Sequence, residues 1–130
     1  MEIKFKSQIC TTREQGERLL ALGLKKETAD MYYRFYDENT YEINPTWDTI
    51  WEDRSDYKKI VPAWSLHRLL SMLPDDAPNI YWILDGASIS IEFEDENCDF
   101  FPHKGDIYEG VVNCIEWLIK EGYFNKEYLV

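Results

Sequence analysis

Oxygen-bearing side chains at alternate positions form the most motif-like feature of this sequence. Asp95, Asn97 and Asp99 occupy the first, third and fifth places of a stretch whose twelfth place is Asp106. This order resembles an EF-hand calcium loop, in which such oxygens surround a hard cation. Phe100, however, stands where the sharp turn of that loop uses glycine, and the twelfth residue is aspartate rather than glutamate. The sequence therefore permits a calcium-like cation site at these four residues, or a solvated acidic loop whose last aspartate caps a helix.

The other residues with nucleophilic or metal-ligating chemistry are few and scattered. They are two histidines, His67 and His103, and three cysteines, Cys10, Cys98 and Cys114. Cys98 and His103 could form a thiol–imidazole pair, but no third group or oxyanion hole is evident beside them. Zinc-ligand spacing and glycine-rich phosphate loops are also missing from the sequence. We therefore expect neither catalytic residues nor a cofactor, and an enzyme is the least favoured class.

A second candidate site combines aromatic and acidic side chains between residues 32 and 57. Tyrosine and tryptophan are effective anchors at protein interfaces because they bury a large apolar area and keep a polar tip. The interleaved acids would favour a basic partner. Alternatively, half of the aromatic residues pack a hairpin on neighbouring helices. The candidate partner-binding residues are Trp47, Trp51, Tyr36, Tyr41 and Tyr57.

The charge balance narrows the classes of partner. The chain has 14 basic and 25 acidic residues, a formal net charge of −11. Direct nucleic-acid binding requires clustered Lys and Arg, and anionic membranes would repel such a chain, so neither is expected. The same acidity permits an inhibitor that imitates DNA and blocks a DNA-binding protein. The expected partner is a protein, with a basic one favoured by charge.

The sequence also predicts a cytoplasmic location. Its first ten residues alternate charged and apolar types without the apolar core of a signal peptide, and no apolar run approaches membrane-spanning length. The odd number of cysteines, with no CxxC pair, is most simply explained by reduced thiols.

The most regular periodicity lies between Asp106 and Tyr123. Its apolar residues recur three and four positions apart, which predicts a helix with one buried face that includes Cys114. Asp106 with Glu109 is typical of a capping box, and Gly122 predicts the end of the helix.

Two shorter helices are expected upstream. One starts at Thr11 or Thr12 and ends at Gly23, and Gly16 inside it costs roughly 1 kcal/mol relative to alanine. The other is a leucine-rich helix capped by Ser65.

Residues 32–43 and 80–94 predict β-hairpins, the second around an Asp-Gly turn. Between them, Asn44–Pro45 begins either a helix that carries the tryptophans or a long acidic loop. A further acidic loop spans residues 95–105. The chain is therefore expected to form a single α+β domain over residues 1–130, with antiparallel β-hairpins packed against about three helices.

Two segments resemble a group of small uncharacterised acidic proteins from gut Bacteroidetes and their phages or mobile elements. The most specific parts are A-D-M-Y-Y near the N-terminal helix and P-A-W-S-L-H-R-L-L before Ser71. No activity is attached to that group. The resemblance implies a cytoplasmic accessory role and favours an inhibitor or a host-interaction protein.

Overall fold

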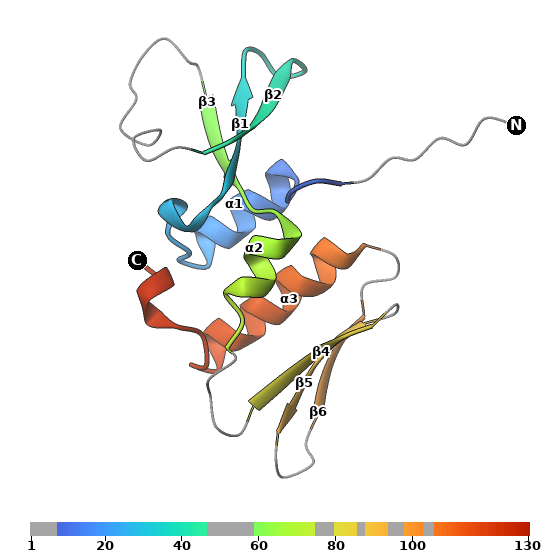
Figure 1. Cartoon of the computed structure of the whole chain (residues 1–130). Helices are drawn as coiled ribbons and strands as arrows, with labels where there is room; N and C mark the ends of the chain where they lie inside the picture. The colour runs from blue at the N-terminus through green and yellow to red at the C-terminus, as the bar shows by residue number, and fades with distance from the viewer. Residues whose placement is uncertain (1–7, 47–58, 75–79, 86–87, 94–97, 103–105) are drawn as a thin grey trace, which may run out of the picture.

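The computed structural model describes residues 8–46, 59–74, 80–85, 88–93, 98–102 and 106–130. A layer of helices lies between two three-stranded sheets, ordered β2-β1-β3 and β4-β5-β6 (Figure 1). All strand pairs are antiparallel, so the predicted α+β class, with hairpins packed on helices in a single domain, is confirmed. The elements are α1 (Arg13–Ala21), β1 (Met31–Phe35), β2 (Tyr41–Pro45), β3 (Lys59–Ala63), α2 (Leu66–Ser71), β4 (Ile80–Leu84), β5 (Ser88–Phe93), β6 (Cys98–Pro102) and α3 (Ile107–Lys120).

The ends of α1 and α3 follow the sequence signals closely. The Thr12 hydroxyl oxygen accepts from the Gln15 N–H, and the side-chain oxygen of Gln15 accepts from the Thr12 N–H. These two bonds complete a capping box. Asp106 caps α3 by accepting from the Glu109 N–H, but the Glu109 side chain binds α1 instead of closing a second box. Gly23 and Gly122, just beyond the two helices, adopt the left-handed conformation that glycine tolerates best.

Two sequence expectations are wrong. Asn44 and Pro45 do not start a helix, because both continue β2 and pair with β1. Proline is tolerated there because β2 is an edge strand of its sheet. Residues 98–102 do not belong to an acidic loop, because they form β6 and pair with β5. Local composition misses such a strand, since its pairing partner supplies the ladder of hydrogen bonds that stabilises it.

Trp64, directly after β3, is bonded to the segment before α1 and to the turn before β1. Its side chain is fully buried, and its indole N–H donates to the Thr28 hydroxyl at 2.9 Å. Its backbone N–H donates to Thr11 Oγ1 at 3.1 Å, and its carbonyl accepts from the Thr11 N–H at 2.8 Å. Trp64 belongs to the larger core cluster around α3, whereas its neighbour Ala63 belongs to a smaller cluster under β1. The tryptophan therefore lies where the two cores meet.

Gly16 is the point at which α1 approaches β3 most closely. A Cβ at this position would lie 2.7 Å from the carbonyl oxygen of Pro62. That oxygen is part of the backbone and cannot rotate away. Glycine at this position lowers the helix propensity of α1 but allows it to pack closely against β3. From the sequence alone, only the lower propensity can be predicted.

A polar cluster joins α1 to α3. The guanidinium of Arg18 lies 2.6 Å from a carboxylate oxygen of Glu116 and 3.4 Å from one of Glu109, and it also donates to Asn113. The hydrogen bond from Arg18 is the main reason why the pKa of Glu116 is lowered. Because the Arg18 and Glu116 side chains are 33% and 29% exposed, solvent screens their attraction in part.

We expect Gly16→Ala to lower the free energy of unfolding by about 1–3 kcal/mol, because α1 must move away from Pro62 to admit the methyl group. Urea denaturation would measure the change. Glu14→Ala, on the exposed face of the same helix, is the matched control and should cost about 0.5 kcal/mol or less. A Gly16→Ala variant as stable as the parent would show that this contact does not constrain α1.

We expect Arg18→Met to lower stability at neutral pH by about 1 kcal/mol. Glu116 has a lower pKa in the folded state than in the unfolded chain, so its contribution is present above its unfolded pKa and is lost as pH falls through the folded one. The difference between parent and variant should therefore shrink in acid. Lys120→Met, which removes a more exposed partner of the same carboxylate, should cost less at every pH. A penalty independent of pH would contradict an electrostatic origin.

Candidate partner-binding site

The turn between β1 and β2 is held by its own hydrogen bonds. The Tyr36 N–H donates to the Thr40 carbonyl at 2.9 Å, which extends the ladder one pair beyond the strands. Oδ1 of Asp37 accepts from the backbone N–H groups of Asn39 and Thr40, each at 2.8 Å. An aspartate that binds the backbone two and three residues ahead fixes the turn in one conformation. The hairpin therefore presents its side chains from a defined frame.

Tyr41 is the most exposed aromatic residue of this hairpin. Its side chain is 51% exposed, although its ring contacts Tyr33 edge-on and Phe35 at a tilt, with both centroid distances at 5.4 Å. Tyr33 and Phe35 are buried and stack on each other. One side of the Tyr41 ring therefore packs on these two buried rings, and the rest of it is exposed. Because this packing already restricts the side chain, less rotamer entropy is lost on binding.

Tyr33, one of the two buried rings under Tyr41, is anchored to the segment that precedes α1. The Tyr33 hydroxyl donates to the Thr11 carbonyl at 2.9 Å and lies 3.7 Å from the Cys10 sulfur. Burial raises the pKa of Tyr33 well above its ordinary value, so the phenol stays neutral. On the other side, the Arg13 guanidinium lies 4.8 Å from the centre of the Phe35 ring. These contacts hold the hairpin against α1.

Three acidic residues lie near Tyr41 along the chain, two in the β1–β2 turn and one on the opposite face of β2. Asp37, Glu38 and Glu42 are all exposed. Glu42, the neighbour of Tyr41 in β2, is 53% exposed and lies 3.8 Å from the Arg34 guanidinium, which is only 15% exposed. The positive charge is therefore largely covered, while the carboxylates face solvent. Exposed carboxylates on the same hairpin as an aromatic anchor favour a basic partner.

The structure separates the predicted partner-binding residues. Tyr36 and Tyr41 are both exposed, at 43% and 51%, and lie at the same end of the hairpin. Strand alternation nevertheless places Tyr36 on the opposite face of the hairpin from Tyr41, so the two rings do not form one patch. Trp47, Trp51 and Tyr57 lie outside the described residues, and their part in this site stays a prediction.

The predicted cation loop is interrupted by β6. Asp99 lies within that strand and pairs with Ile91, so the chain is extended where an EF-hand loop would turn. Asp106 caps α3 at 3.2 Å from the Glu109 nitrogen. Asp95 and Asn97 are outside the described residues, as is His103. Within the described ranges, no group of three or more His, Cys, Asp or Glu side chains is arranged to hold a metal ion. The loop geometry behind the calcium hypothesis is therefore wrong, while its ligand set stays a prediction.

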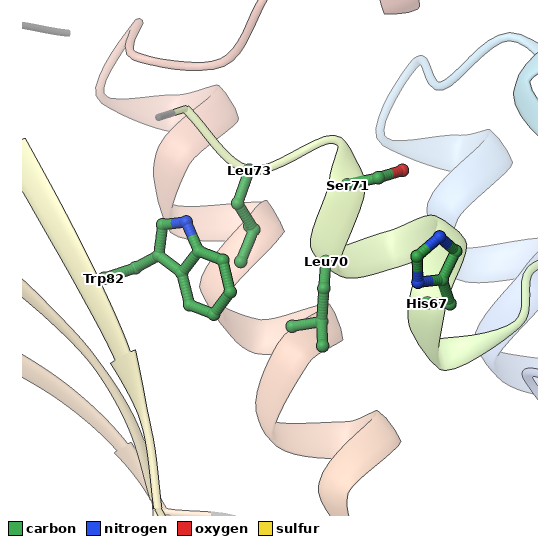
Figure 2. Close-up of a pocket in the computed structure, with 5 residues that line it drawn as sticks. All are labelled: His67, Leu70, Ser71, Leu73 and Trp82. Atoms are coloured by element: carbon green, nitrogen blue, oxygen red, sulfur yellow. The ribbon is translucent and has the colours of Figure 1, made fainter. Parts of the chain in front are cut away.

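A separate groove of about 350 Å³ lies between α2 and β4 (Figure 2). Among the described residues that line it, the only titratable side chain is the exposed imidazole of His67, and the one hydroxyl, on Ser71, already donates to the Arg68 carbonyl at 2.7 Å. Such a lining provides apolar contact but no paired acid and base for catalysis. The groove is lined by His67, Leu70, Ser71, Leu73 and Trp82.

Two thiols are buried and poorly suited to nucleophilic chemistry. Cys10 and Cys114 are free, and each is at most 1% exposed. Burial raises the pKa of Cys114 to about 12 and also raises that of Cys10, so both remain protonated near neutral pH. The thiolate is the reactive form, and it is therefore scarce at both positions.

We expect Asp106→Ala to lower the free energy of unfolding by about 1 kcal/mol, because α3 loses its N-cap. Asp106→Asn should retain most of the stability, since the amide oxygen can still accept from the Glu109 N–H. Thermal denaturation with and without millimolar calcium would test both roles of this residue. Equal stability of the two variants would contradict capping, and a calcium-dependent stabilisation that is lost in Asp106→Asn would indicate a cation site.

No protein-family model, no curated protein and no solved structure matches this chain. Every helix in the described part is too short or too polar to cross a lipid bilayer. The geometry and charge of the β1–β2 hairpin are therefore the features that bear on function.

Proposed function

We propose that this protein is a non-catalytic interaction module that binds a basic protein partner through its β1–β2 hairpin. The observation that carries the proposal is the Tyr41 side chain, half exposed on a packed aromatic base in an edge strand whose opposite face carries the solvent-facing carboxylate of Glu42. Aromatic anchors of this kind contribute much of the binding energy at protein interfaces. The module acts in the cytoplasm, where free thiols such as Cys10 and Cys114 stay reduced.

Charge supports the choice of partner in two ways. The net charge of −11 increases the rate of encounter with a basic surface and disfavours encounters with acidic ones. At the hairpin, Arg34 is mostly covered, so the carboxylates dominate the field that a partner meets. Because exposed charges are screened by salt, attraction by the acids alone would weaken strongly at about 0.5 M salt, whereas aromatic burial would persist.

The cation-site hypothesis and the DNA-mimic hypothesis have less support from the positions of the described residues. A cation site lacks the continuous loop that suggested it, since β6 crosses the stretch. An inhibitor that imitates DNA would be one special case of an acidic module with a basic partner, and it needs carboxylates spaced like phosphates. The interaction module is favoured because it uses the anchored aromatic residue as well as the charge.

We expect Tyr41→Ala to reduce capture of the natural partner from a cell lysate by at least about tenfold, since loss of a central aromatic anchor costs 1.4 kcal/mol or more. Tyr36→Ala would show whether the opposite face also contributes. Tyr123→Ala is the matched control, because that ring is 43% exposed but lies beyond α3. Melting temperatures of all variants would verify that each remains folded.

The captured protein should have a basic surface, and its binding to purified parent protein should be measured directly in low and high salt. Equal capture by the parent and by Tyr41→Ala would exclude this hairpin as the binding site. Loss of capture in Tyr123→Ala alone would move the site to the C-terminal end of α3.

A further inference from the structure

The hydrogen-bond register shows which backbone groups of the β1–β2 hairpin point outward. The Thr46 N–H donates to the Asp30 carbonyl at 3.0 Å, and the Tyr36 N–H donates to the Thr40 carbonyl at 2.9 Å. Both hydrogen-bonded pairs, one at each end of the β1–β2 ladder, consist of even-numbered residues. Because bonded and non-bonded pairs alternate along an antiparallel ladder, the backbone N–H and C=O groups of the even-numbered residues of β2 point toward β1. The N–H and C=O groups of Tyr41 and Ile43 therefore point away from the sheet.

Proline positions agree with this register. Pro45 in β2 and Pro62 in β3 both pair with β1 at positions without hydrogen bonds, where the nitrogen of each faces outward. Proline at an edge position removes a donor that the sheet does not use. The outward edge of β2 thus offers two N–H donors, on Tyr41 and Ile43, followed by the carbonyl of Pro45.

The two edges of this sheet differ in how they are covered. Beyond β3, the chain before α1 pairs with Trp64 through Thr11, and α1 itself presses on the Pro62 carbonyl at Gly16. Beyond β2, no residue in the described part of the chain bonds to the outward groups of Tyr41 or Ile43. One edge is therefore closed by the protein's own segments, whereas the other carries no such bond within the described residues.

Side chains on the two faces of β2 define what could pair with it. Tyr41 and Ile43 lie on the face that packs toward Tyr33, and Ile43 is half-buried against that core. Glu42 lies on the opposite face and is 53% exposed. Directly opposite residues on neighbouring strands have Cβ atoms about 5 Å apart, so apolar residues would match the first face and a basic residue the second.

We infer that the partner binds as an extended basic segment that adds to β2 as a fourth strand. The inference rests on the proposed function and specifies its chemistry. Main-chain bonds to Tyr41 and Ile43 provide the affinity, an apolar side chain covers the exposed Tyr41 ring, and a Lys or Arg side chain faces Glu42. Pro45 and the Asp37 turn end the pairing on either side, so the recognised segment is short, with alternating apolar and basic residues.

Ile43→Pro is the decisive variant, because it removes the outward N–H without removing any β1–β2 hydrogen bond. Proline also keeps the preceding residue extended, as β2 requires. Ile43→Ala is the matched control, because it shortens the side chain and leaves the donor in place. Amide exchange of β1 would show that the hairpin persists in both variants.

The probe is a synthetic peptide of alternating lysine and valine, about eight residues long, which covers the length of a typical strand. A second peptide of the same sequence carries N-methyl groups at alternate amides and cannot pair as a strand. We expect the first peptide to protect the Tyr41 and Ile43 amides from exchange and to bind Ile43→Pro at least about tenfold more weakly than Ile43→Ala. The N-methylated peptide should not bind.

Equal binding of the two peptides, equal binding by the two variants, or no binding to the parent protein would overturn strand addition. The proposed function is judged separately with the partner captured from lysate. If Ile43→Pro retains that partner while Tyr41→Ala loses it, the strand inference fails and the hairpin remains the binding site. If both variants retain it, the hairpin itself is excluded.

Discussion

Burial of Trp64 with all of its polar groups satisfied is the constraint on which the rest of the structure depends. The indole is fully buried, so its N–H requires a partner inside the protein, and the Thr28 hydroxyl provides it. Its backbone is bonded in both directions to Thr11. These bonds join three segments that are distant in sequence, and they fix α1, β3 and the turn before β1 relative to one another. The two core clusters meet here, since Trp64 belongs to one and its neighbour Ala63 to the other.

The same constraint leaves the two edges of the first sheet unequal. Since Thr11 is bonded to Trp64, the chain must enter α1 beside β3, and Gly16 lets the helix lie against Pro62. That packing closes one edge. The strand β2 lies on the far side of β1 and receives no such cover from the described residues. The surface that we propose for partner binding is therefore a consequence of how the core is closed.

The residues that hold the helices together differ from those that we propose for binding. Arg18, Glu109 and Glu116 hold α1 on α3, and the apolar face of α3 fills the larger core. The hairpin contributes Tyr33 and Phe35 to the smaller core and keeps Tyr41 partly exposed above them. An exposed aromatic residue costs solvation free energy in the isolated protein, which is recovered when a partner covers it. This division allows the hairpin to be altered without unfolding the helical layer.

The sequence by itself determined the helices and most of the hairpins, because capping residues, glycine stops and apolar periodicity act over a few neighbouring positions. Thr12, Ser65, Asp106 and Gly122 behave as those local rules require. Tertiary structure alone decided that residues 98–102 form β6, since a strand depends on a distant partner for its hydrogen bonds. It also decided that Gly16 is a contact point, that Tyr36 and Tyr41 lie on opposite faces, and that no described residue pairs with the outer edge of β2. Each of these outcomes depends on register and on which segment covers which edge, and neither is encoded in the spacing of nearby residues.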